Sequence, residues 1–344
     1  SDFGLMLGFN LQEQNFLGSG NTVGIGINKN IYSEMYNISY MNPYATRDAV
    51  SLGYNVFFRE TDYGEFNVAN YLTNSNGFGA QFGYPISDIS RLGFNITYDK
   101  TDIDIGTLPA REIYDFVSVE GNIFETLTAQ LSWQQVTLNR GLFPTDGAST
   151  VVSFSSTIPG SDLSYYRFNI RQRYYQPLSS DFVFGFQGEI GYLDSYGDTE
   201  EIPFFQNFYA GGSRSLRGFE SNTLGPRSTD APCYEFNYEE GTCPNLIDTD
   251  GDGEADAPYL NPYANQGQRS RYRDAPIGGN IKVEGSLQLI FRLPFIEDQR
   301  SLRSAFFFDF GNVFSDNCKE YQINCSELSV DELRYSYGVG ITWI

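Results

Sequence analysis

Apolar residues alternate with polar or small residues through most of this chain, and no other feature restricts its fold so strongly. In segment 51–59, for example, one face would carry Leu52, Val56 and Phe58. The same period recurs near residues 92–98, 127–133, 281–293 and 335–343. Successive side chains of a β-strand point to opposite faces, so a period of two residues predicts strands. No segment has a sustained helical period, and the sequence therefore predicts an all-β fold.

Two kinds of all-β protein fit this alternation. A soluble β-sandwich exposes its polar face to water, whereas a transmembrane barrel turns its apolar face to lipid and its polar face to a wet lumen. Several alternating runs have about ten or more residues, which is the length that a tilted membrane-crossing strand needs and roughly twice that of a typical soluble strand. The longest unbroken apolar strings, such as 305–308, are far too short for a spanning helix.

The lengths of the connections favour the barrel. We expect 13 strands, near residues 3–12, 20–29, 32–41, 49–60, 77–85, 89–101, 125–139, 149–158, 164–176, 181–194, 279–293, 302–314 and 333–344. When the connections are taken alternately, one set is short, and the other contains every long one: 61–76, 102–124, 195–278 and 315–332. Alternate connections of an up-and-down barrel lie at opposite rims, and outer-membrane barrels have short periplasmic turns and long outer loops. The sequence therefore predicts one domain over residues 1–344, a transmembrane antiparallel up-and-down β-barrel.

The composition excludes several functions. The chain contains no histidine, which rules out Ser-His-Asp and Cys-His catalytic sites, His-ligated zinc and histidine general bases. The 43 Asp and Glu residues outnumber the 22 Lys and Arg residues, and the net charge of −21 argues against nucleic acid as a partner. An enzyme that uses a pair of carboxylates stays open.

Four cysteines form two close pairs, Cys233 with Cys243 and Cys318 with Cys325. Neither pair has the C-x-x-C spacing of a zinc or thioredoxin-like site. Four buried thiols are one interpretation. We favour two local disulfides, which require an oxidising compartment. Each pair lies within one long connection, so both would lie at the outer rim, and cross-pairing between the two connections is the alternative.

The longest connection, 195–278, contains an unusual segment. Residues 202–219 are aromatic, Gly-rich and basic, although the rest of the connection is acidic. An exposed flexible loop is one interpretation, yet exposed loops rarely present several large aromatic side chains to water. We expect this segment to fold back into the lumen, where Arg217 would need an acidic partner on the inner face of a strand.

Several short motifs in and around this segment point to one family. In the long connection they are Phe208-Tyr209-Ala210-Gly211-Gly212, Arg217-Gly218-Phe219 and Leu224-Gly225-Pro226. Supporting motifs lie at residues 16–20, 42–44, 143–147, 158–162 and 308–311. Together they resemble the BamA family, the central outer-membrane protein assembly factors of Gram-negative bacteria, over essentially the whole chain. Arg-Gly-Phe marks the sixth outer loop of that family; related transporters share this motif alone.

The resemblance implies a 16-stranded barrel in the outer membrane, preceded by five periplasmic POTRA domains. Strand 3–12 matches the family's second strand and strand 333–344 its fourteenth. We therefore expect the POTRA domains, the first strand and the last two strands to be absent from this chain. Their absence would account for the odd number of strands, since single-chain bacterial barrels close with an even number.

The activity that the resemblance implies is the folding and insertion of β-barrel proteins into the bacterial outer membrane, by strand pairing at a lateral seam. Such an activity requires no covalent chemistry and no cofactor, so the chain would not be an enzyme. The implied partners are outer-membrane lipid, unfolded outer-membrane protein clients and accessory lipoproteins of the assembly complex. The alternatives are a two-partner-type secretion pore of the same superfamily and a passive porin.

The resemblance also implies roles for individual residues. Arg217, Gly218 and Phe219 would form a loop-docking motif, whose arginine docks against acids on the inner wall of the barrel. Asp309 fits one acid position. Gln288 occupies the other, where the family often has Glu, and we expect its neutral amide to weaken that half of the pairing.

Residues 248–256 carry a pattern that does not depend on the resemblance. Acids stand at alternate positions with Gly253 at the sixth, as at the start of an EF-hand calcium loop. The expected ligands are Asp248, Asp250, Asp252, Glu254 and Asp256. Tyr259 replaces the bidentate Glu at position 12, so we expect weakly bound, structural calcium. A solvated acidic loop without calcium is the alternative.

Overall fold

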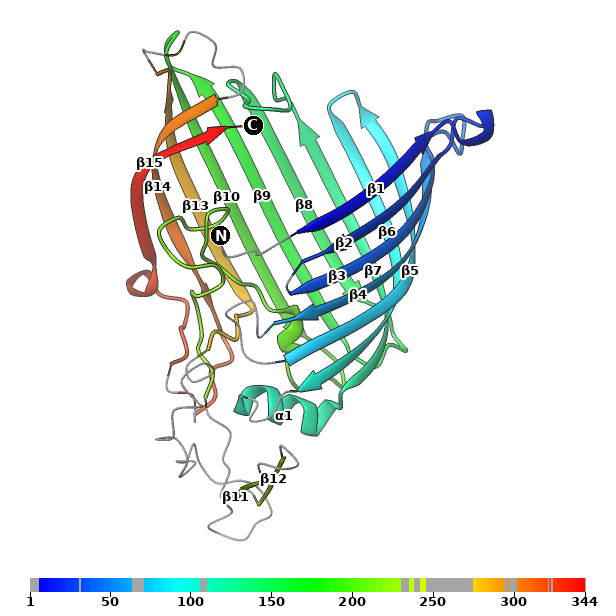
Figure 1. Ribbon diagram of the computed structural model, residues 1–344, viewed down its shortest axis with the longest axis vertical. Coiled ribbons are helices and arrows are strands. Elements are labelled where there is room, and N and C mark those ends of the chain that lie inside the picture. Colours follow the sequence, from blue (N-terminus) through cyan, green and yellow to red (C-terminus); the bar gives the residue numbers. More distant parts are fainter. Residues whose placement is uncertain are drawn as a thin grey trace.

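The computed structural model describes residues 6–30, 32–63, 71–105, 110–229, 235–237, 242–245, 275–293, 296, 302–320, 322 and 324–343. Thirteen strands form one antiparallel sheet, in which each strand pairs with the next strand of this sheet along the chain (Figure 1). They are β1 (Leu7–Gln14), β2 (Thr22–Lys29), β3 (Ser33–Asn42), β4 (Ser51–Asp62), β5 (Tyr71–Ser87), β6 (Ser90–Ile105), β7 (Ile123–Val136), β8 (Gly147–Thr157), β9 (Tyr165–Pro177), β10 (Phe182–Ser195), β13 (Ile281–Phe291), β14 (Leu302–Phe314) and β15 (Arg334–Trp343). The predicted fold class and number of strands are confirmed.

The remaining elements lie in the connections. Between β10 and β13 a separate two-stranded sheet is formed by β11 (Glu235–Asn237) and β12 (Thr242–Asn245). Single 3₁₀ turns occur at η1 (Phe16–Gly18), η3 (Phe204–Gln206) and η5 (Val330–Glu332). The observed strands follow the predicted ones, but β5 begins at Tyr71 instead of residue 77, and β6 ends at Ile105 instead of residue 101. Residues 73–76 of β5 are all polar, so alternation could not reveal this part of the strand.

One helix, α1 (Arg111–Glu120), lies in the connection between β6 and β7. The sequence did not predict this helix, although the all-β fold class holds. Ile113 and Phe116 are buried, and a spacing of three residues places them on one face of the helix. The helix has only 10 residues, too few for its period to stand out among alternating strands. Within the described ranges, no helix is both long and apolar enough to cross a membrane.

The two sets of connections lie at opposite ends of the sheet. The end that carries α1, β11 and β12 is at the bottom of Figure 1, and we call it the long-connection end. The short turns, including 15–21, 88–89 and 178–181, join the strands at the other end, here called the short-turn end. The alternation of short and long connections that the sequence predicted is present.

The outer face of the curved sheet is apolar and exposed. Ile38, Val56, Phe78, Leu131 and Val339 are each more than half exposed, although all five lie in regular strands. Soluble monomers rarely expose a continuous apolar area of this kind. In a transmembrane barrel the same band meets the hydrocarbon of the bilayer.

The hydrophobic core lies inside the curve of the sheet, in the space we call the lumen. Its members come from the wall strands, from α1 and from the long connection between β10 and β13. Aromatic side chains dominate it, and Phe116 of α1 packs edge-on against both Phe124 of β7 and Phe204 of the long connection. The sheet therefore surrounds its core, and side chains of the long connection make up much of that core.

Candidate functional site

The part of the long connection that precedes its small sheet folds into the lumen, and we call residues 202–229 the docking loop. Phe204 and Phe208 are only 6% and 3% exposed. Phe208 exchanges backbone hydrogen bonds with Gly279, at 2.8 and 3.1 Å, which ties the two arms of the connection together. Burial of one such side chain stabilises a fold by about 1.5–3 kcal/mol. The predicted return of this segment into the lumen is confirmed.

Arg217 of the docking loop pairs with Asp309 of β14. The guanidinium donates from Nε to Oδ2 at 2.7 Å and from Nη2 to Oδ1 at 2.6 Å, which is a bidentate geometry. The backbone N–H of Arg217 donates to the same carboxylate at 3.1 Å. The Asp309 side chain has no exposed surface, whereas Arg217 is 25% exposed. The contact between these residues that the sequence predicted is present.

Gln288, the second predicted partner of Arg217, does not contact it directly, and Ser286 takes that place. Arg217 Nη2 donates to Ser286 Oγ at 2.8 Å, and Gln288 Nε2 donates to that same hydroxyl at 3.2 Å. Gln288 thus supports the site through Ser286 and not by direct contact. Ser286 lies opposite Asp309 in the sheet, on the polar face that it shares with Gln288, and this position was the available signal in the sequence.

Phe307 forms the floor of the arginine site. The Arg217 guanidinium lies over its ring, 3.6 Å from the ring centroid. The ring in turn lies against Gly338 of β15, where a Cβ atom would come within 2.8 Å of it. An aromatic residue on the polar face of a strand gave no clear signal before the fold was known. Arg217 therefore contacts β13 and β14 directly, and β15 lies behind the ring.

Beside this site, a charged network joins the docking loop to the wall. Ser215 Oγ donates to Glu284 of β13, and Lys282 lies 3.1 Å from Glu284 and 3.7 Å from Glu189 of β10. Arg171 of β9 completes the network at 3.1 Å from Glu189. Alternating charges across three neighbouring strands satisfy one another, so these acids can lie partly buried in the lumen.

A second arginine holds the aromatic part of the docking loop. Arg167 of β9 lies over the ring of Phe208, 4.1 Å from its centroid, and its Nη1 donates to the backbone carbonyl of Gln206 at 3.4 Å. The cation–π contact joins β9 to the loop at a point well separated from Asp309.

Glycines permit sharp bends of the docking loop at residues 211 and 218. Gly211 has φ of +106°, and a Cβ atom there would lie 2.3 Å from the carbonyl oxygen of Glu220. Gly218, next to Arg217, has φ of +88° and packs against Ser336 of β15. Only glycine adopts such angles without strain. Gly211 and Gly218 therefore set the direction of the loop, and Arg217 makes the hydrogen bonds to the wall.

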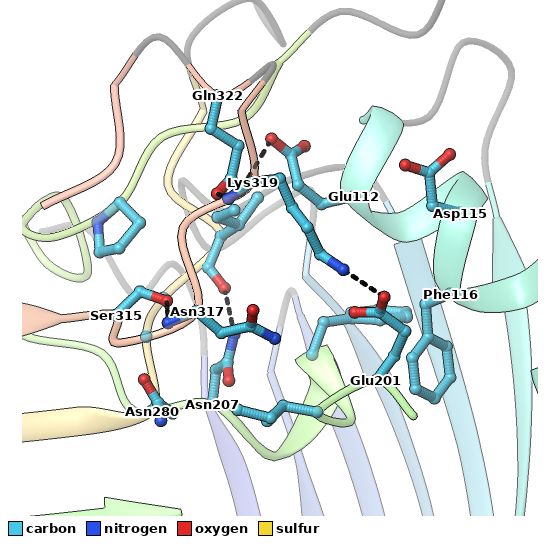
Figure 2. A pocket seen from close by; sticks show the side chains of 16 residues that line it. Glu112, Asp115, Phe116, Glu201, Asn207, Asn280, Ser315, Asn317, Lys319 and Gln322 are labelled. Carbon is cyan, nitrogen blue, oxygen red and sulfur yellow. Dashed lines mark hydrogen bonds and ion pairs between the residues drawn. The ribbon is translucent and has the colours of Figure 1, made fainter. Parts of the chain in front are cut away.

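Three connections meet at the long-connection end and form a surface that we call the cover (Figure 2). They are the β6–β7 connection with α1, the β10–β13 connection with the docking loop, and the β14–β15 connection. The N–H of Thr229 in the docking loop donates to both carboxylate oxygens of Glu112 in α1, at 3.1 Å each. From the β14–β15 connection, Gln322 donates to Glu112 at 3.2 Å, and Lys319 pairs with Glu201. Figure 2 shows both contacts as dashed lines across one polar pocket. Burial raises the pKa of the Glu112 carboxyl, because the surrounding protein replaces the water that would stabilise its charge.

Cys318 and Cys325 form a disulfide within the β14–β15 connection, with Cα atoms 5.9 Å apart, as predicted. Cys233 lies outside the described residues, so its pairing with Cys243 remains a prediction. The same holds for the proposed calcium ligands Asp248, Asp250, Asp252, Glu254 and Asp256. Within the part of the chain that the structure describes, no group of three or more Cys, Asp or Glu side chains is arranged to hold a metal ion.

Residues 15–344 match the Omp85 superfamily domain. Over its whole length the chain is 28% identical to the outer membrane protein assembly factor BamA of Neisseria meningitidis and spans 41% of that protein. Over 98% of its length it is 23% identical to the sorting and assembly machinery component 50 homolog of Mus musculus, of which it spans 61%.

Solved structures lead to the same family. The crystal structure of BamA from Haemophilus ducreyi lacking POTRA domains 1–3 superposes on 99% of the chain with a TM-score of 0.79 and 26% identity, and the chain spans 61% of it. CdiB from Escherichia coli superposes with a TM-score of 0.53 at 9% identity, a likeness that concerns the fold alone.

Proposed function

Because this chain belongs to the Omp85 superfamily of outer-membrane β-barrels, we propose that it promotes the folding and insertion of β-barrel proteins into the bacterial outer membrane. The similarity is to assembly factors and not to enzymes, which agrees with the expectation that the chain catalyses no covalent chemistry. The observation that carries the proposal is the docked arginine. A charged loop residue is bound bidentately to a fully buried carboxylate inside a membrane-embedded wall.

The docked loop gives this barrel a property that a simple pore lacks. Arg217 joins the loop to β13 and β14, and Gly218 brings it against β15. A loop held at these points fixes the relative positions of three consecutive strands. In our proposal this region supports the seam of the barrel, which must open and close without the wall collapsing.

The proposed mechanism follows from the cost of bare backbone groups in lipid. A strand at the edge of an open seam leaves its N–H and C=O groups without partners, and each unsatisfied group costs several kcal/mol in the hydrocarbon. An unfolded client strand can pair with that edge by β-augmentation. Successive client hairpins would then enter the membrane already hydrogen-bonded. Unfolded outer-membrane proteins and membrane lipid are thus the proposed partners, and accessory lipoproteins are proposed from the similarity to BamA.

Reconstitution tests this function. The full-length protein is placed in liposomes with an urea-unfolded small β-barrel client, and the folded client is followed by its heat-modifiable migration on gels. We expect the protein to accelerate client folding over empty liposomes. Arg217→Ala should lose that acceleration, whereas Arg214→Ala, an exposed arginine of the same loop, should retain it.

The same experiment separates the alternatives. Transport of a client into the liposome lumen without its membrane insertion would favour a secretion pore. Steady ion conductance with no effect on client folding would favour a porin. Either result would contradict the proposed assembly function.

A further inference from the structure

The connection between β7 and β8, residues 137–146, is a built structure and not a simple hairpin turn. Asn139 accepts hydrogen bonds from the backbone N–H groups of Thr145 and Asp146, at 3.1 and 3.4 Å, and its amide donates to Thr145 Oγ1 at 2.9 Å. Phe143 has φ of +47°, a left-handed conformation that costs a bulky residue free energy. Such a conformation persists where surrounding contacts hold it.

Those contacts lie inside the lumen at the short-turn end. Leu138 packs against a small cluster on the inner wall made by Tyr175 of β9, Ile290 of β13 and Ala305 of β14. Pro144 is buried, although it lies in a connection. The connection therefore folds back against the wall instead of extending away from the barrel.

Arg303, near the start of β14, binds this connection from across the lumen. Its Nη2 donates to the backbone carbonyl of Pro144. The guanidinium lies 5.3 Å from the ring centroid of Phe143 and 5.0 Å from that of Tyr175. Three strands of the wall, β9, β10 and β13, separate β8 from β14, so this contact spans part of the lumen and does not join neighbouring strands.

We propose that Arg303 is a positioning residue that holds the 137–146 connection across the short-turn end of the lumen as a second closure. The docking loop fills the opposite end. Both closures depend on an arginine, and Asp309 lies six residues after Arg303 on the same lumen-facing side of β14. This strand thus carries the attachment point of each closure. The inference does not rest on the assembly function and would hold for any activity of the barrel.

A guanidinium is the group that this site requires. It donates a hydrogen bond in the plane of its fork while its face stacks on aromatic rings, and Lys offers a donor without a stacking face. Arg303→Met should therefore release the connection, and Arg303→Lys should hold it only in part.

The test measures motion of the connection with no client protein present. Leu142, which is 68% exposed, is changed to Cys and spin-labelled in the folded barrel in detergent or lipid. With Arg303 intact we expect a broad, immobilised spectrum. Arg303→Met should narrow it, Arg303→Lys should give an intermediate line shape, and Arg91→Met, an exposed arginine on β6 near the same end, should leave it unchanged.

A second variant distinguishes release of the connection from misfolding of the wall. Phe143→Asn removes the stacked ring but keeps a residue that tolerates the left-handed conformation, and it leaves β14 untouched. It should narrow the spectrum as Arg303→Met does. An immobilised label in both variants, with heat-modifiable migration showing intact barrels, would overturn the proposal. Loss of this closure with normal client folding would support it and leave the proposed assembly function unaffected.

Discussion

Among single residues, we expect the charged groups inside the lumen to be the most sensitive to substitution. Asp309 has no contact with solvent, and the Arg217 side chain supplies two of its hydrogen bonds. Removing one partner of a buried ion pair leaves the other charge uncompensated, which costs about 3–5 kcal/mol. We therefore expect the loss of either side chain to destabilise the docked loop strongly.

The Arg217–Asp309 pair should show strong coupling in a double-mutant cycle. Arg217→Ala and Asp309→Asn should each lower the urea midpoint of unfolding. The double variant should lose less than the sum of the two, because it leaves no unpaired charge behind, whereas each single variant does. Additive losses would mean that the two side chains stabilise the fold independently.

Glu112 should make the cover sensitive to pH. Burial raises its pKa in the folded state above the unfolded value, so the folded protein binds the proton more tightly. The resulting stabilisation is present below the unfolded pKa and is lost as the pH rises through the folded pKa. Glu112→Gln cannot lose a proton, so its Tm relative to the unmodified protein should increase from about pH 4 to pH 7. Asp198→Asn, which alters an exposed acid at the same end, serves as the control.

Among the elements, the β14–β15 connection joins α1 to the docking loop. Its disulfide closes a loop from Cys318 to Cys325, and this loop reaches α1 through Gln322 and the docking loop through Asn324, whose carbonyl accepts from Arg227 N–H at 2.9 Å. A cross-link of this kind stabilises mainly by restricting the unfolded chain. The connection can therefore hold other elements because its own shape is fixed.

Cys318→Ser/Cys325→Ser should loosen the cover without unfolding the wall. Disulfides contribute roughly 2–4 kcal/mol, with short loops at the lower end of the range. We expect faster proteolysis within 315–333 and near α1, while heat-modifiable migration stays normal.

Non-reducing peptide mapping of the unmodified protein should find Cys233 joined to Cys243. A peptide joining Cys243 to Cys318 would contradict the local pairing.

The acidic segment 248–256 remains a proposed calcium site. Without the bidentate acid at position 12, its Kd should lie on the order of 10⁻⁴–10⁻³ M, as in extracellular modules. Calorimetric titration should show binding heat that Asp250→Asn/Asp252→Asn abolishes. An absence of heat at millimolar calcium would leave a solvated acidic loop as the explanation.

The sequence predicted elements well where one local rule decided the outcome. Alternation located the 13 strands, and the alternate lengths of the connections separated the two ends. It missed α1, whose 10 residues form too few turns for a visible period, and the start of β5, where residues 73–76 are all polar. The resemblance to a known family, and not a local pattern, implied the pairing of Arg217 with Asp309. The contacts of Arg217 with Ser286 and Phe307 were not predicted, since they depend on the register between β13, β14 and β15. Register arises from pairing across the sheet and leaves little local trace in the sequence.

For the molecule as a whole, the two faces of the wall require opposite chemistry. Val56 and Asn55 are neighbours on β4, but Val56 is 59% exposed on the apolar outer face, whereas Asn55 lies beside Gly79 on the lumen side. The same substitution at adjacent positions therefore meets lipid in one case and water in the other.

A lysine at these two positions should separate the faces. Val56→Lys should destabilise the barrel in lipid by about 2–4 kcal/mol if the residue lies near the midplane of the bilayer. Asn55→Lys should change the stability little. Urea titrations in liposomes of one lipid composition measure both. Equal losses would contradict the assignment of the outer face to lipid.

The position of the core inside the sheet restricts the order in which the chain can fold. Tyr71 and Tyr209 meet in the lumen although 138 residues separate them, and the Arg217–Asp309 contact closes a span of 92. Contacts between such distant residues form slowly, because the entropy of closing the chain is lost before the contacts stabilise it. A wall that curled completely before the docking loop entered would shut out its own core. We therefore expect the entry of the docking loop to limit the rate at which the barrel matures, and the wall to close around a loop already in place.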